Sequence, residues 1–198
     1  MDIAILDLIQ VHLRSPLMDA LMLAATHLGD LALVWLAAGA VLAAQPRYRR
    51  YGAAVLLAVA ATAVLGMLVL KPLFGRVRPF EAYGFMGLLV PPPAGNSFPS
   101  NHSMVSFAAA AALCCVPGRG RLSVALKAAG VALARLIAIS RLYLYVHYPS
   151  DILVGAVVGA AVGVLSVRLV LWLWPEKTPS RPRPRPAPAP RARLIGER

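Results

Sequence analysis

The sequence predicts an all-helical bundle that crosses a membrane several times, and three observations support this prediction. Of the 198 residues, 59% are hydrophobic and only 14% are charged, a balance that excludes a disordered chain and an ordinary soluble protein. The mean hydropathy is +0.70. The apolar residues also fall in blocks of about 20, which is the length of helix that crosses a bilayer.

Five apolar segments are expected to form helices, and they give four or five membrane spans. Charged residues, proline or glycine mark the ends of each segment. The segments cover residues 17–44, 51–70, 101–116, 122–140 and 152–174. Within the first segment, the polar stretch from His27 to Asp30 is expected to separate an interfacial piece from a shorter crossing that starts near residue 31. Lys71-Pro72 ends the second segment, because a lysine followed by proline is a typical helix stop.

The two ends of the chain are predicted to lie outside the bilayer core. Residues 1–14 are typical of a short amphipathic helix on the membrane surface, so we assign residues 1–30 to interfacial helices. Residues 175–198 include the run RPRPRPAPAPRAR, which predicts a disordered cytoplasmic tail. Residues 1–174 then form one membrane-embedded domain of five to six helices.

The charge balance predicts both the orientation and the kind of partner. The formal net charge is +12, and a basic membrane protein favours lipid phosphates or phosphorylated substrates over nucleic acid. Thirteen basic residues, seven of them in the tail, fall on one side of the predicted weave and five on the other. The positive-inside rule makes the first side cytoplasmic. We therefore expect a multi-pass protein of the cell membrane.

Three polar clusters interrupt the apolar chain, each at the outward end of a predicted span. They are Lys71-Pro-Leu-Phe-Gly-Arg76-Val-Arg78-Pro79, Pro99-Ser100-Asn101-His102, and Ser140-Arg141 followed by His147 and Asp151. Lys71, Arg78 and Arg141 supply donors suited to phosphate oxygens. Ser100 or Asn101 suits the N-cap of the next helix, whose first N–H groups can also point at a phosphate.

Two histidines in these clusters, His102 and His147, can act as nucleophile, acid or base near neutral pH. Asp151 follows His147 by four residues, close to one helical turn, so its carboxylate can hold one imidazole nitrogen and raise the basicity of the other. This is the arrangement of a nucleophile and its orienting group, with histidine as the attacking residue. A hydrolytic metal site is disfavoured, because such sites use several carboxylate or imidazole ligands and this chain has eight acidic residues.

The three clusters, in this order, resemble the signature of the type 2 phosphatidic acid phosphatase family. These membrane lipid phosphatases share a helical core with vanadium haloperoxidases and bacterial acid phosphatases. The family pattern reads K-x6-RP, PSGH and SR-x5-H-x3-D, and this chain departs from it at Asn101, where the pattern has glycine. The ten matching residues are Lys71, Arg78, Pro79, Pro99, Ser100, His102, Ser140, Arg141, His147 and Asp151.

The resemblance implies a mechanism at the matching positions. His147 would attack phosphorus and form a phosphohistidine with the help of Asp151, while His102 would protonate the leaving oxygen and then activate water. Phosphoryl oxygens would be held by Lys71, Arg78, Ser100 and Arg141, with the backbone of Asn101 beside them. No metal or organic cofactor is expected, and the oligomeric state is left open.

The resemblance leaves several functions open. It favours hydrolysis of polyprenyl (undecaprenyl) diphosphate, with phosphatidic acid, phosphatidylglycerol phosphate and lipid A phosphate as alternative substrates. A lipid phosphotransferase and a non-enzymatic lipid-binding protein are alternatives of other classes.

Three features outside the signature also carry expectations. Arg76 either touches a second phosphate or faces solvent and headgroups. Arg135 lies inside a span, where an ionisable residue is costly, so it either belongs to the floor of the site or pairs with Asp30. The four-residue spacing of glycines at 155, 159 and 163 predicts close packing of the last helix against another.

Overall fold

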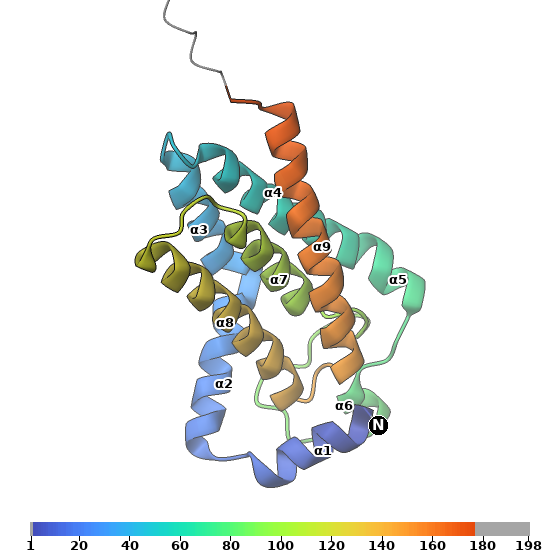
Figure 1. The fold of residues 1–198 in the computed structure, drawn as a ribbon. Coiled ribbons are helices and arrows are strands. Elements are labelled where there is room, and N and C mark those ends of the chain that lie inside the picture. Colours follow the sequence, from blue (N-terminus) through green and yellow to red (C-terminus); the bar gives the residue numbers. More distant parts are fainter. Residues whose placement is uncertain (1, 177–198) are drawn as a thin grey trace, which may run out of the picture.

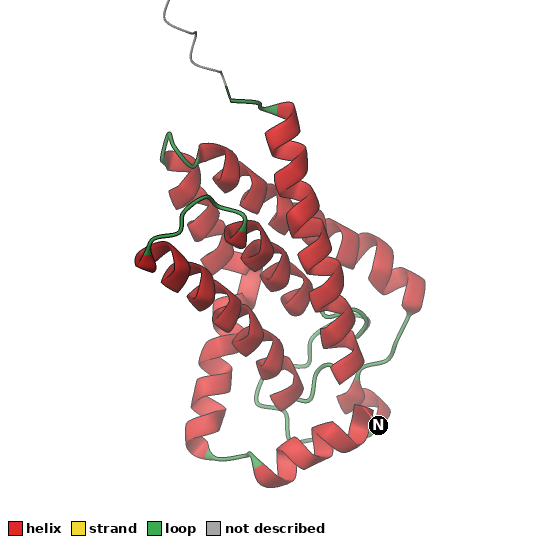
Figure 2. Cartoon of the chain, viewed as in Figure 1, coloured by secondary structure: helices red, strands yellow, loops and turns green. Residues whose placement is uncertain are grey.

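The computed structural model describes residues 2–176, which form helices and connecting loops without any strand in this range (Figure 1 and Figure 2). The helices are α1 (Asp2–His12), α2 (Pro16–Gly29), η1 (Asp30–Ala32), α3 (Leu33–Ala44), α4 (Arg49–Val64), η2 (Leu65–Leu70), α5 (Lys71–Phe74), α6 (Pro79–Ala82), α7 (Asn101–Cys114), α8 (Arg121–Tyr143) and α9 (Pro149–Leu173). The predicted all-helical class is confirmed. Most of the predicted tail, residues 177–198, lies outside the described residues.

Four helical stretches are long and apolar enough to cross a membrane by length and composition. They are Pro16–Ala44, Arg49–Ala82, Arg121–Tyr143 and Pro149–Leu173. The fifth predicted segment forms α7, which has 14 residues and lies at the centre of the bundle, in contact with α4, α8 and α9. The predicted polytopic bundle is therefore confirmed, with a short central helix surrounded by the longer ones.

At one end of the bundle, α1 runs across the ends of the other helices (Figure 1). Leu6 of α1 is fully buried in a cluster with Phe80 and Tyr143, while Leu8 and Val11 are exposed. A helix with one buried apolar residue and further exposed apolar residues fits the amphipathic helix predicted here. Its position on a membrane surface stays a prediction.

The break predicted near His27 to Asp30 is a kink between α2 and α3. Leu31 and Ala32 have positive φ angles of 50° and 56°. The left-handed conformation costs a residue other than glycine about 1–2 kcal/mol. Such strain often marks functional sites, and here it fixes the position of Asp30 at the inner turn of the kink.

The backbones of α7 and α9 touch along the predicted glycine spacing. A Cβ atom added at Gly159 would lie 2.1 Å from the carbonyl oxygen of Met104, and one at Gly163 would lie 2.2 Å from that of Ala108. Gly155 similarly faces the backbone at the start of α7. No side chain fits at these points, so the predicted packing role of the three glycines is confirmed.

Replacing Gly159 by alanine should therefore destabilise the protein. The added methyl group forces α7 and α9 apart, and overpacking of this kind costs about 1–3 kcal/mol. We expect a lower thermal midpoint in detergent. Gly130→Ala is the matched control, because a Cβ there would meet only Leu113, at 3.7 Å. Equal midpoints for the two variants would contradict the role of Gly159.

Candidate active site

The three polar clusters meet at the end of the bundle where α8 ends and α9 begins. Ser100 caps α7 through its hydroxyl, which accepts a hydrogen bond from the N–H of Ser103 at 3.5 Å. The N–H of Ser100 in turn donates to the carbonyl oxygen of Asp151 at 3.1 Å. This hydrogen bond joins the starts of α7 and α9, so the second and third clusters are directly connected.

His147 and Asp151 form the predicted pair. Nδ1 of His147 lies 3.3 Å from Oδ2 of Asp151, and both side chains are buried. The same carboxylate oxygen accepts hydrogen bonds from the N–H of Tyr148, at 2.9 Å, and from the hydroxyl of Ser97. Because Asp151 is held by these donors, it fixes the ring of His147 in one orientation and leaves Nε2 directed toward Arg78.

The surroundings of His147 favour its neutral form. Burial is the largest cause that lowers its pKa to about 3. The hydrogen bond to Asp151 opposes this shift, while the positive charges of Arg141 and Arg78 add to it. An imidazole that is neutral at physiological pH has a lone pair on Nε2, which is what a nucleophile needs.

Three cations lie in this region, and Arg78 is the one that approaches Nε2 of His147. Arg78 is buried, and its Nη1 lies 3.3 Å from Nε2 of His147 and 3.0 Å from the carbonyl oxygen of Val146. Nζ of Lys71 donates to the carbonyl oxygen of Asn96 at 2.8 Å. The first cluster therefore joins the site through backbone carbonyls, which position its cations without neutralising them.

Arg141 is the third cation, and it is only 5% exposed. One of its terminal nitrogens donates to the hydroxyl of Thr26 on α2. Its Nε has no hydrogen-bond partner among the described residues. A buried guanidinium with an unused donor is costly, so this geometry favours an anion that completes it.

Asn101, which replaces the glycine of the family pattern, is the first residue of α7 and does not have a positive φ angle. Its Oδ1 points toward Gly66 of η2, where an added Cβ would lie 2.3 Å away. The larger side chain is thus accommodated by a glycine on the neighbouring helix. The N-terminus of α7 keeps ordinary helical geometry, which leaves its N–H groups suited to an anion.

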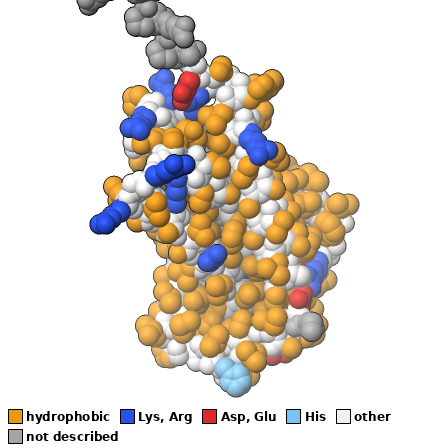
Figure 3. Space-filling model, viewed as in Figure 1, with side chains coloured by type: hydrophobic (Ala, Val, Ile, Leu, Met, Phe, Trp, Pro, Cys, Tyr) orange, Lys and Arg blue, Asp and Glu red, His pale blue; other side chains and the backbone are white. Residues whose placement is uncertain are grey.

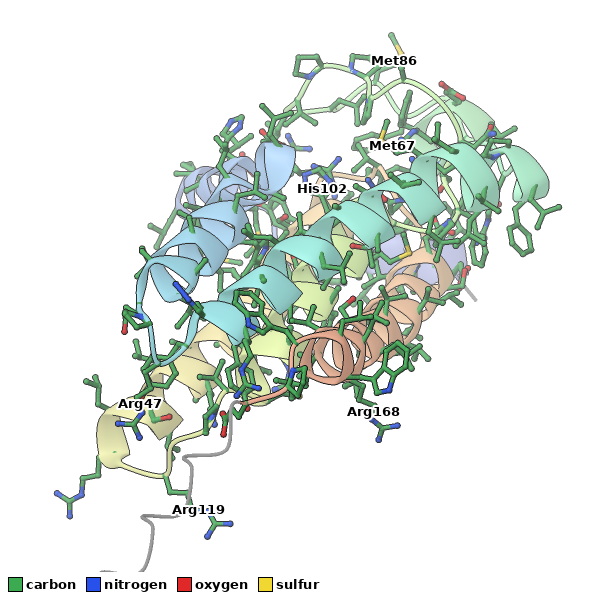
Figure 4. The ribbon with its side chains drawn as sticks, turned by 90° about the horizontal axis from the view of Figure 1, so that it is seen from above. Arg47, Met67, Met86, His102, Arg119 and Arg168 are labelled. Carbon is green, nitrogen blue, oxygen red and sulfur yellow. The ribbon has the colours of Figure 1, made fainter. Side chains whose placement is uncertain are left out.

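His102, on the first turn of α7, approaches the end of α2. Its Nε2 lies 3.1 Å from Oδ1 of Asp30, and Figure 4 shows His102 between the helices, with Arg47 and Arg168 pointing away from it. Arg141 binds Thr26 on the same α2 helix, so α2 brings His102 and Arg141 to one site. Sequence analysis missed Asp30 as a site residue, although the polar interruption that contains it was visible.

Arg76 was predicted to touch a second phosphate or to face solvent and headgroups, and the structure adds contacts with Asp151 and its neighbours. Its Nη1 donates to Oδ1 of Asp151 and to Ser150 Oγ, at 2.7 Å each, and its Nη2 lies 3.1 Å from Asp2. The guanidinium also stacks over the ring of Tyr148 at 3.8 Å. Through these contacts Arg76 supports Asp151, and its contact with a second phosphate stays a prediction.

The two expectations for Arg135 are wrong. Its side chain is exposed on α8 and lines a shallow groove with Lys127 and Cys114. Asp30, the predicted partner, binds His27 and His102 instead. Among residues 2–176, no group of three or more His, Cys, Asp or Glu is arranged to hold a metal ion.

The chain is similar in sequence to two curated proteins. Over 136 residues the chain is 29% identical to the undecaprenyl-diphosphatase of Sulfolobus acidocaldarius, an alignment that covers 69% of this chain and 63% of the relative. Over 101 residues it is 36% identical to the lipid A 4'-phosphatase of Bacteroides thetaiotaomicron, covering 48% of this chain and 43% of the relative. The chain thus spans less than two thirds of the length of either relative.

Two solved structures have similar folds. LpxE of Aquifex aeolicus matches with a TM-score of 0.71 and 28% identity, covering 84% of this chain and 94% of the other. A transmembrane PAP2-type phosphatidylglycerolphosphate phosphatase of Bacillus subtilis matches with a TM-score of 0.71 and 24% identity, covering 89% and 87%. The model of the PAP2 superfamily matches residues 51–175, which include all three clusters. The match covers more than half of this chain, and the chain therefore belongs to the PAP2 superfamily.

Proposed function

We propose that this protein is an integral membrane phosphatase that hydrolyses a phosphate ester or diphosphate on a lipid through a phosphohistidine. One observation carries the proposal: the imidazole of His147 is oriented by Asp151 and lies against the buried guanidinium of Arg78, and Arg141 and Lys71 add positive charge to the same site. Such a set of charges fits a tetrahedral phosphoryl group better than a neutral ligand. The relatives named as lipid phosphatases support the same reaction class.

The reaction proceeds in two steps at this geometry. In the first, Nε2 of His147 forms a bond to phosphorus while the bond to the leaving oxygen breaks, and His102 donates a proton to that oxygen. In the second, His102 takes a proton from water, the water oxygen bonds to phosphorus, and the bond to His147 breaks. Arg78 and Arg141 stabilise the charge that spreads over the phosphoryl oxygens, so the mechanism needs no metal.

The proposed substrate is polyprenyl (undecaprenyl) diphosphate, and the undecaprenyl-diphosphatase relative supports this choice. Phosphatidic acid, phosphatidylglycerol phosphate and lipid A phosphate are the alternatives, and the lipid A 4'-phosphatase relative supports the last. Phosphate release by purified protein from each lipid, with and without a chelator, tests the choice. A faster reaction with a glycerolipid monophosphate would overturn it.

A lipid phosphotransferase would share the first step and then pass the phosphoryl group to an acceptor other than water. Phosphate release with and without an acceptor lipid separates the two reactions. A fall in released phosphate, matched by phosphorylated acceptor, would favour the transferase.

We also propose that the protein lies in the cell membrane with its site outward and its C-terminal end in the cytoplasm. Lys and Arg side chains gather at the end of the molecule with the α3–α4 and α7–α8 connections (Figure 3). These connections carry Arg47 and Arg119, which lie at the end of the molecule away from His102 (Figure 4), and the positive-inside rule favours this end as cytoplasmic. Hydrolysis of a membrane-impermeant phosphate ester by intact spheroplasts tests the orientation.

Replacing Arg76 by glutamine should lower kcat without a matching change in KM. The variant removes the 2.7 Å hydrogen bond to Asp151, so the carboxylate that orients His147 loses a charged partner. Loss of a supporting partner of this kind typically costs about 10–100-fold in activity. Kinetics of the purified variant measure the effect, and Arg121→Gln, at the exposed start of α8, is the control. A rise in KM alone would instead indicate that Arg76 binds substrate.

A further inference from the structure

The kink after α2 places one carboxylate between two imidazoles. Oδ1 of Asp30 lies 3.1 Å from Nε2 of His102, and Oδ2 lies 2.9 Å from Nδ1 of His27. His102 belongs to the predicted catalytic set, whereas Asp30 and His27 lie outside the three clusters. A carboxylate bound to one ring nitrogen fixes which nitrogen of the histidine exchanges protons.

The backbone around Asp30 is shaped to bring it against His102. A Cβ added at Gly29 would lie 2.8 Å from Cδ2 of His102 and 2.7 Å from Cγ2 of Ile137, so only glycine allows this approach. On the other side of Asp30, Leu31 and Ala32 hold left-handed conformations that cost free energy. A close approach and a strained turn on either side of one residue indicate that its position is specified.

The electrostatics of the site explain why a carboxylate is needed there. A general acid must carry a proton, but burial and the positive charges of Arg141 and Lys71 disfavour a cationic His102. At the start of η1, Asp30 supplies the opposing negative charge, and among the described residues it is the carboxylate hydrogen-bonded to this ring. His27 is the remaining titratable group in contact with Asp30, and it occupies the oxygen that faces away from His102.

We propose that Asp30 is a positioning residue that holds His102 through Nε2 and favours its protonated form, an inference that rests on the function proposed above. Nδ1 of His102 then carries the proton that moves to the leaving oxygen when His147 attacks phosphorus. In the second step Nδ1 takes a proton from the attacking water. Asp30 touches neither substrate nor phosphorus, and it acts only through His102.

The experiment compares phenyl phosphate with p-nitrophenyl phosphate, whose leaving group needs far less help from a general acid. Asp30→Asn keeps the size of the side chain and removes its charge. We expect kcat/KM, which reports the step in which the leaving group departs, to fall by about 10–100-fold for phenyl phosphate and by a clearly smaller factor for p-nitrophenyl phosphate. In the pH–rate profile for phenyl phosphate, the loss of activity at alkaline pH should begin at least about one pH unit lower, because the protonated form of His102 loses its counter-charge.

Asp19→Asn, on the preceding helix α2, is the matched control. Asp19 accepts a hydrogen bond from the hydroxyl of Tyr143 at 2.6 Å and pairs with Arg14 at 3.5 Å, so its role is structural. This variant should leave the ratio of the two rates and the loss of activity at alkaline pH unchanged. An Asp30→Asn enzyme that behaves in the same way, or that loses equal activity on both esters, would overturn the proposal.

The Asp30→Glu variant and parallel assays of wild type and His147→Gln complete the experiment. If Asp30→Asn does not fold, Asp30→Glu retains the charge but displaces the carboxylate, so it must lower the phenyl to p-nitrophenyl rate ratio. An unchanged ratio counts against the proposal. Wild-type protein and the His147→Gln variant are assayed in parallel. If wild-type protein is inactive on every phosphate, the proposed function fails, whereas an active wild type with an unaltered Asp30→Asn profile refutes only the role of Asp30.

Discussion

Replacing His147 by glutamine should reduce kcat by at least about 10³-fold, the largest loss expected from a single substitution here. Glutamine keeps a polar side chain beside Asp151 but cannot form a bond to phosphorus. The acid-labile phosphoprotein that wild type forms with labelled substrate should also be absent. Rapid-quench labelling and steady-state phosphate release measure the two effects.

The matched control for this experiment is His12→Gln, because His12 lies exposed on α1. It should retain wild-type activity and labelling. A His147→Gln protein that is folded and active would refute the phosphohistidine mechanism, and it would do so whatever the substrate.

The same substitution should alter the dependence of stability on pH. Unfolded His147 has an ordinary pKa near 6.5, whereas burial holds the folded group's pKa near 3. Between these values the unfolded chain binds the proton more readily, so acidification favours unfolding. The variant should therefore lose less stability than wild type when the pH falls from 7 to 5.

Replacing Arg141 by glutamine should lower kcat/KM by about 10²–10³-fold while raising thermal stability in phosphate-free detergent. The activity falls because a buried donor to the phosphoryl oxygens is lost. The stability rises because Arg141 is buried beside other cations, and its Nε has no partner among the described residues. Thermal melts with and without inorganic phosphate measure the second effect, and phosphate should stabilise wild type more than the variant.

Arg168→Gln, on the exposed side of α9, provides the comparison for Arg141. It should change neither the activity nor the response to phosphate. If Arg141→Gln melts below wild type in both conditions, then Arg141 is a structural residue whose contact with Thr26 outweighs its burial.

Local patterns predicted most of the helices and the three polar clusters. The stop predicted at Lys71-Pro72 was wrong: proline fits the first turn of α5, and the helix continues to Phe74 before Gly75 ends it. Apolar length predicted the spans, and the spacing of His147 and Asp151 predicted a contact that the structure places at 3.3 Å. The glycine spacing in α9 likewise predicted its contact with another helix. Each of these inferences depends on residues within one or two helical turns, where the geometry of a helix determines which side chains are neighbours.

The missed partners are contacts between distant parts of the chain. Asp30 reaches His102 across 72 positions, and Arg76 reaches Asp151 across 75. No helical period relates such pairs, because their proximity depends on how the helices pack and on the kink at residues 30–32. The contact of Arg76 with Asp151 was missed for this reason: its neighbour Arg78 lies beside Nε2 of His147, but the loop turns Arg76 toward the carboxylate behind His147.

The close backbone contact between α7 and α9 has a consequence for how the protein responds to its bilayer. Helices accommodate a thicker or thinner membrane by tilting. The distance between two helices changes more easily where flexible side chains fill the interface than where the two main chains are in contact. Because His102 starts one of these helices and Asp151 the other, the spacing of the reacting groups should stay constant while outer helices such as α3 adjust. Turnover should then depend little on lipid chain length, provided that the substrate can still enter.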